Sequence, residues 1–160
     1  MNVSIFEIER RMNLGGWYTN PMLLKGDSLN RTIDDDASVL NTLNLTANFI
    51  GEKMFLLIYQ AKGTDWFKPI TTDTHTVEIH HRRGLITCPW ALNEYESCNF
   101  NNWMATSDEF KISNTINGTT VTGLVLSIHM IKEHCFFGGG GTKSRLEPHM
   151  LADLLNTNKD

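Results

Sequence analysis

The stretch TLNLTANFIGEKMFLLIYQ, residues 42–60, decides the fold class that the sequence predicts. Polar and apolar residues alternate strictly from Thr42 to Phe49, which is typical of a strand with one buried face. Gly51-Glu52 then suits a turn, and residues 54–60 are rich in strand-favouring side chains. The pattern therefore predicts a β-hairpin.

Strand signals continue along the rest of the chain. Four further strands are expected, joined in pairs by Arg82-Arg83-Gly84 and by the turn dipeptide Asn117-Gly118. Their expected ranges are Thr74–His81, Leu85–Cys88, Glu109–Asn114 and Thr119–Ile131. Short consecutive strands joined by turns favour antiparallel pairing.

Helical signals are confined to three places. Ser4 and Glu7 fit a capping box, which predicts a helix near the N-terminus, with a short strand as the alternative. Pro148 suits the first turn of a C-terminal helix. The aspartates at 34–36 read as a surface loop or as the cap of a short third helix.

Together these signals predict a mainly β fold, an antiparallel β-sandwich or barrel with a short helix near each terminus. An α+β arrangement is the alternative. Strands do not alternate with long helices, which argues against a parallel dinucleotide-binding sheet. A chain of 160 residues can bury one ordinary core, so we expect a single globular domain spanning residues 1–160.

Charge and composition restrict the partners. The formal net charge of −4 disfavours general nucleic-acid binding. The N-terminus lacks the pattern of a signal peptide, and the longest apolar run, residues 54–59, is too short to cross a bilayer. Three cysteines without a CxxC motif argue against a disulfide framework and against a zinc knuckle. We expect a cytoplasmic protein without membrane association, in an oligomeric state that the sequence does not specify.

The segment HTVEIHHRRG, residues 75–84, contains a candidate metal site. On a strand, His75 and His81 lie roughly 20 Å apart, too far to bind one ion. Glu78 and His80 share the opposite face at a chelating spacing. His129 is expected on the polar face of the strand at 119–131 and becomes the third ligand if the two strands are neighbours. The candidate site is thus Glu78, His80 and His129, with a solvated sheet face as the alternative.

A second candidate is a partner-binding surface. It combines a basic turn, loop tryptophans and two cations beside the glycine run at 138–141. Its expected members are His80, His81, Arg82, Arg83, Trp66, Trp90, Lys143 and Arg145. Solvent-facing cations and tryptophans that close the ends of the core are the alternatives. The glycine run does not match a phosphate loop, because Thr142 stands where that pattern requires glycine.

Recognisable catalytic machinery is missing from the sequence. There is no GxSxG motif, Cys88 is expected to pack in the core, and Cys98 is expected to be exposed. The sequence therefore predicts a binding or inhibitory module that engages a protein partner, of the kind that phages and mobile elements carry, without a catalytic residue and without a cofactor apart from the candidate metal. The alternative is a small-ligand-binding protein or a metal-dependent enzyme that uses Glu78, His80 and His129.

Overall fold

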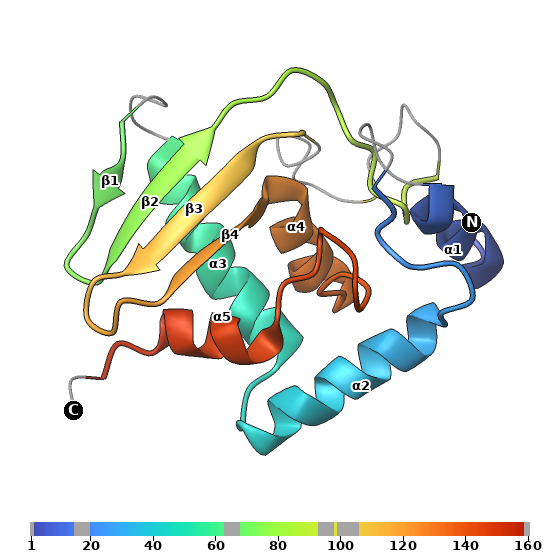
Figure 1. Cartoon of the computed structure of the whole chain (residues 1–160), viewed down its shortest axis with the longest axis horizontal. Coiled ribbons are helices and arrows are strands. Elements are labelled where there is room, and N and C mark those ends of the chain that lie inside the picture. Colours follow the sequence, from blue (N-terminus) through green and yellow to red (C-terminus); the bar gives the residue numbers. More distant parts are fainter. Residues whose placement is uncertain (1, 15–19, 63–67, 93–97, 99–105, 159–160) are drawn as a thin grey trace.

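The computed structural model describes residues 2–14, 20–62, 68–92, 98 and 106–158. Within these ranges the chain forms five helices and one four-stranded antiparallel sheet (Figure 1). The elements are α1 (Ile5–Leu14), α2 (Leu29–Thr42), α3 (Ala47–Lys62), β1 (Ile70–Thr71), β2 (His75–His80), β3 (Glu109–Asn114), β4 (Thr120–Leu124), α4 (Val125–His134) and α5 (Pro148–Leu155). Helix accounts for 43% of the structure and strand for 14%, so the fold is α+β. The prediction of a mainly β sandwich or barrel is wrong.

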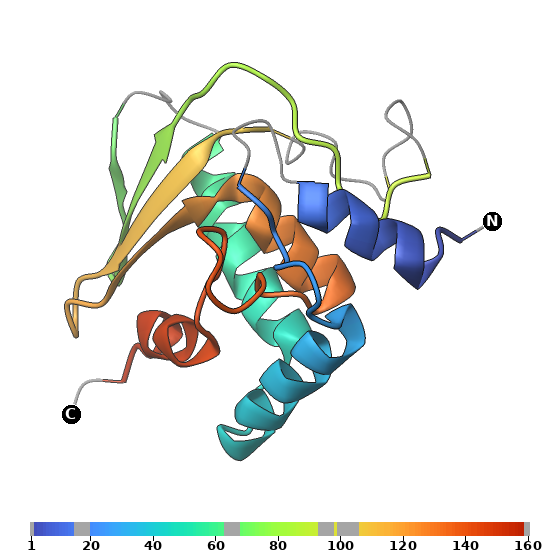
Figure 2. The ribbon, with the colours of Figure 1, turned by 45° about the vertical axis from the view of Figure 1, so that its right-hand side comes forward.

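The sheet is open, and the described helices that pack on it lie on one of its faces. Its strand order is β1-β2-β3-β4, and His80 lies opposite Glu109 in the pairing of β2 with β3. Figure 2 shows the sheet on one side of the molecule and α3, α4 and α5 on the other. Ile79, Phe110 and Val121 face these helices and belong to the larger buried cluster. The alternate residues of the strands form the uncovered face of the sheet.

A second buried cluster lies on the other side of α4. It joins α1 and the start of α2 to the segments around residues 22–23 and 86–88, and Met12, Leu29 and Cys88 are among its members. Leu126 and Met130 of α4 pack in this cluster, whereas Ile128 and Ile131 of α4 pack in the larger one. Helix α4 is therefore enclosed between the two clusters.

The hairpin expected at residues 42–60 is instead a helix end followed by a helix start. Asn44 adopts a left-handed backbone with φ of 54°, and the amide of Leu45 donates to the carbonyl of Leu40 at 3.0 Å. This pattern ends α2 in the manner of a Schellman motif. The hydroxyl of Thr46 then accepts from the amide of Phe49 at 3.1 Å and caps α3. The strict alternation thus covers two helix termini rather than a strand.

Helix α3 is placed by a helical repeat of apolar residues. Ile50, Met54 and Ile58, each four residues apart, are fully buried. Gly51 does not form the expected turn. It lies inside α3, where an added Cβ would come within 2.5 Å of the Cα of Lys132 on α4. The glycine is required because the two helix backbones approach closely at this point.

The strand expected at residues 119–131 continues only to Leu124. From Val125 the chain is helical, and every residue from Val125 to Ile131 is buried. A helix that is buried all round shows no amphipathic period in its sequence. The apolar residues at 124, 126, 128 and 130 therefore show the same alternation as a strand with one buried face.

The return strand expected at Leu85–Cys88 is also wrong. Strand β2 pairs with β1 and β3, and residues 85–88 lie in the long connection from β2 to β3. The basic residues at 82–83 are accordingly not the tip of a hairpin. The turn at Asn117-Gly118 does join β3 to β4, with Gly118 at a positive φ of 77°.

Both terminal helices are confirmed. The amide of Glu7 donates to the hydroxyl of Ser4 at 3.2 Å at the start of α1, and Pro148 lies in the first turn of α5. The strands at β2 and β3 also lie where they were expected, whereas α2 is a full helix of 14 residues rather than a short one. No helix in the described ranges is both long enough and apolar enough to cross a membrane.

Candidate metal centre

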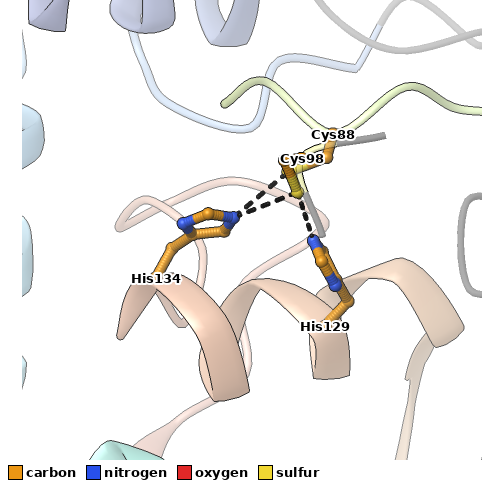
Figure 3. A group of neighbouring side chains, drawn as sticks. All are labelled: Cys88, Cys98, His129 and His134. Atoms are coloured by element: carbon orange, nitrogen blue, oxygen red, sulfur yellow. Dashed lines mark hydrogen bonds between the residues drawn. The ribbon is translucent and has the colours of Figure 1, made fainter. Parts of the chain in front are cut away.

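Four side chains that bind transition metals meet beside α4. They are Cys88, Cys98, His129 and His134, and their ligating atoms all lie within 4.8 Å of one another (Figure 3). Two thiols and two imidazoles are the donor set of tetrahedral Cys₂His₂ zinc sites. The group therefore has the composition of a complete metal site.

Helix α4 supplies both histidines. His129 lies in its buried part and His134 is its last residue, after which Cys135 adopts a left-handed conformation with φ of 57° and ends the helix. Figure 3 shows both imidazole rings projecting from α4 toward the two cysteines. The spacing of the two histidines is H-x₄-H, which lies within the range found in zinc sites.

The two cysteines come from the connection between β2 and β3. The chain turns immediately after Cys88, where the amide of Ala91 donates to the Cys88 carbonyl at 2.9 Å. Arg11 of α1 holds this turn, because its guanidinium donates to the carbonyls of Pro89 at 2.9 Å and Ala91 at 2.5 Å. Contacts that are independent of any metal thus place Cys88 opposite α4.

The ligating atoms lie within 4.8 Å of one another, and two of the shorter distances match a tetrahedral site. The Cys98 sulfur lies 2.9 Å from His129 Nε2 and 3.4 Å from His134 Nε2, and the Cys88 sulfur lies 3.5 Å from His134 Nε2. Tetrahedral geometry with ordinary zinc bond lengths separates the donor atoms by roughly 3.3–3.8 Å. One ion at the centre of the group would thus be within bonding reach of all four residues after small side-chain adjustments.

The ionisation of the group also suits a metal. The hydrogen bond from Cys88, with further hydrogen bonds from His134 and His129, lowers the pKa of Cys98 to about 5. The hydrogen bond to Cys98 and burial raise the pKa of Cys88, and burial lowers the pKa of His134. At neutral pH, Cys98 is therefore a thiolate and His134 is neutral, which are the forms that bind metals.

Neighbouring aromatic rings fix the histidine at the end of α4. The indole of Trp90 stacks on the His134 ring with centroids 4.1 Å apart and an interplanar angle of 3°, and Trp90 also contacts Phe136. His129 Nδ1 is buried without a hydrogen-bond partner in the described part of the chain. The other ring nitrogen, Nε2, faces the Cys98 sulfur and is the atom available to a metal.

The structure separates the ligands that the sequence suggested. Glu78 and His80 lie on the uncovered face of the sheet, 3.5 Å from each other, whereas His129 is buried in α4. The expected convergence required His129 on a strand beside β2, and the strands beside β2 are β1 and β3. Of the three residues, only His129 belongs to the metal-ligand group.

The expected roles of the cysteines are also revised. Cys88 is buried as predicted, but its sulfur faces ligands rather than only apolar side chains. Cys98 is half-buried beside the histidines, and the exposed thiol is Cys135. A CxxC motif was absent because the two cysteines are ten residues apart and the fold brings them together. The signal that the sequence did offer was the H-x₄-H spacing.

The expected partner-binding residues are spread over several environments. His80, His81, Arg82 and Arg83 are exposed, with His81 3.0 Å from Asp108 and Arg82 3.3 Å from Glu109. Trp90 belongs to the shell of the metal-ligand group. Trp66 lies outside the described residues.

The cations beside the glycine run differ in role. Lys143 is exposed. Arg145 forms a bidentate pair with the buried carboxylate of Asp36 at 2.6 and 2.7 Å and also donates to the carbonyl of Gly138. Arg145 therefore ties the segment before α5 to α2, and its place in a binding surface stays a prediction.

Comparison with models of known protein families found no match, and neither did comparisons with curated proteins and with solved structures.

Proposed function

We propose that this protein binds one zinc ion through Cys88, Cys98, His129 and His134, and that the ion has a structural role. The observation that carries the proposal is the approach of four ligating atoms to within 4.8 Å of one another. Thiolate and imidazole donors in tetrahedral arrangement favour zinc over the harder divalent ions. Four protein ligands leave no open position for substrate or water, which favours a structural over a catalytic site.

The ion would join the connection between β2 and β3 to α4. Cys88 and Cys98 belong to this connection, and both histidines belong to the buried helix that the two hydrophobic clusters share. A connecting segment loses conformational entropy when it is fixed, and metal bonds compensate for that loss. Zinc would therefore hold this part of the chain in a defined position on the helical core.

Metal analysis of the purified protein tests the proposal. We expect about one zinc ion per chain in the unmodified protein. Cys98→Ser and His129→Ala should each remove most of the metal, because each deletes one of four ligands. Cys135→Ser is the matched control, since Cys135 is exposed and lies outside the ligand group. Absence of stoichiometric metal, or equal metal content in Cys98→Ser and Cys135→Ser, would contradict the proposal.

Contact with an acidic protein surface is a second candidate function. It is favoured by the consecutive exposed residues His81, Arg82 and Arg83, which follow β2. Proteins captured by the unmodified chain should be compared with those captured by Arg83→Glu, with Lys53→Glu on α3 as the control. We expect Arg83→Glu alone to lose acidic partners. Identical sets of captured proteins would remove this function from consideration. An origin in a phage or mobile element stays a prediction.

A further inference from the structure

A large cleft opens against strands β2, β3 and β4. Its volume is about 910 Å³, and its lining comes from β2, β3, β4 and the segments near residues 20–22, 82–86 and 143–144. Small-molecule sites commonly have volumes of about 300–1,000 Å³. None of the four proposed zinc ligands lines the cleft.

The ionisable residues of the cleft are mainly basic. His80, Arg82, Lys111 and Lys143 line it, and Glu109 is the one carboxylate in its described lining. Because Arg82 lies 3.3 Å from that carboxylate, the negative charge of Glu109 is already compensated. Lys111 and Lys143 form no ion pair within the described part of the chain. A chain with net charge −4 thus collects an excess of positive charge at one concave site.

The rest of the lining is suited to a ligand with both polar and apolar parts. The hydroxyls of Thr122 and Ser144 can donate hydrogen bonds to an anion, and Met22, Ile86 and Leu124 supply apolar surface. A cleft of this size fits a small molecule. The overall negative charge of the chain disfavours a nucleic-acid polymer, which binds chiefly through many phosphate contacts.

We propose that this cleft binds a phosphorylated small molecule, with its phosphate between Lys111 and Lys143 and its remaining part against the apolar lining. Lysine ammonium groups recognise phosphate through charge-assisted hydrogen bonds, which are the strong ones in proteins. The geometry thus assigns the binding function to residues that the zinc proposal does not use.

Calorimetric titration of the purified, metal-containing protein tests the inference. The probes are AMP and pyrophosphate, with adenosine as the control that lacks phosphate. We expect AMP and pyrophosphate to bind at concentrations up to the millimolar range, and adenosine to bind at least about tenfold more weakly. Absence of binding by both phosphorylated probes, or equal affinity for AMP and adenosine, would overturn the proposal.

Lysine variants place the binding in the cleft. Lys111→Ala and Lys143→Ala should each weaken binding of AMP by about tenfold, because each removes a charged donor. Lys53→Ala is the matched control, since Lys53 lies on α3, outside the cleft, and contacts the Phe49 ring. The zinc content of all three variants should equal that of the unmodified protein, which separates this inference from the metal proposal. Affinity unchanged in both cleft variants would overturn it.

Discussion

Removal of zinc should lower the midpoint of thermal unfolding by about 10 °C. Free zinc at a thousandfold excess over its dissociation constant stabilises the bound protein by about 4 kcal/mol, and each kcal/mol shifts the midpoint of a chain of this size by about 2–4 °C. The experiment compares thermal unfolding before and after treatment with a strong chelator, followed by return of zinc. The midpoint should recover when zinc is restored.

Two variants test whether the four proposed ligands cause this change in the unfolding midpoint. Cys98→Ser should unfold at a lower temperature from the start and should not respond to the chelator, because its site is already incomplete. Cys135→Ser should behave like the unmodified protein. A midpoint that the chelator leaves unchanged in the unmodified protein would show that the group does not hold a stabilising metal.

Acidification should weaken zinc binding. The pKa of Cys88 is raised, so a bound metal must displace its proton, and lower pH makes that displacement harder. Cys98, whose pKa is lowered to about 5, begins to take up a proton only near that pH. The effect of the chelator on the midpoint should therefore shrink as the pH falls from 7 toward 5. A constant effect over this range would argue against thiolate ligands.

Asp36→Ala should destabilise the fold by about 3–5 kcal/mol, the usual cost of removing one partner from a buried ion pair. Asp36 has only 6% of its side chain exposed, and its loss leaves Arg145 without the carboxylate that both of its terminal nitrogens contact. Arg145 would keep its contacts to Gly138 and to Glu147. Denaturant unfolding measures the difference in the free energy of unfolding.

A neighbouring residue provides the control for the Asp36→Ala variant. Asp35 precedes Asp36 on α2 but is exposed. Its replacement by alanine should change the free energy of unfolding by no more than about 0.5 kcal/mol. Similar losses in the two variants would mean that general charge or helix propensity, rather than the pair with Arg145, determines the result.

The parts of the fold that local chemistry determines could be predicted from the sequence. The capping box at Ser4 starts α1, Asn117-Gly118 turns the chain between β3 and β4, and Pro148 begins α5. In each case the residues that give the signal lie within a few positions of one another. The physical cause and its structural effect are then both local.

The errors arose where burial or long-range packing decides the structure. Helix α4 is buried all round, so its sequence lacks a polar face that would show a helical period. At residues 42–49 an eight-residue alternation predicts a strand, whereas Asn44 ends one helix and Thr46 caps the next. Directly after this segment, the four-residue spacing of Ile50, Met54 and Ile58 is the pattern that indicates a helix.

The candidate metal site could not be predicted from the sequence, because it too depends on long-range packing. Cys88 and Cys98 lie far from the histidines in sequence, and the cysteines themselves do not have the short spacing that identifies zinc sites from sequence alone. The approach of Cys88 and Cys98 to the two histidines of α4 creates the site. The sequence predicts His129 as a ligand, but together with Glu78 and His80, which lie on the uncovered face of the sheet.

X-ray absorption spectroscopy at the zinc edge of the purified protein identifies the atoms that bind the ion. We expect four ligands, two sulfurs at about 2.3 Å and two nitrogens at about 2.0–2.1 Å. The Cys98→Ser protein reconstituted with zinc should show at most one sulfur. A six-coordinate ion surrounded by oxygen and nitrogen alone in the unmodified protein would contradict the assignment of Cys88, Cys98, His129 and His134 as its ligands.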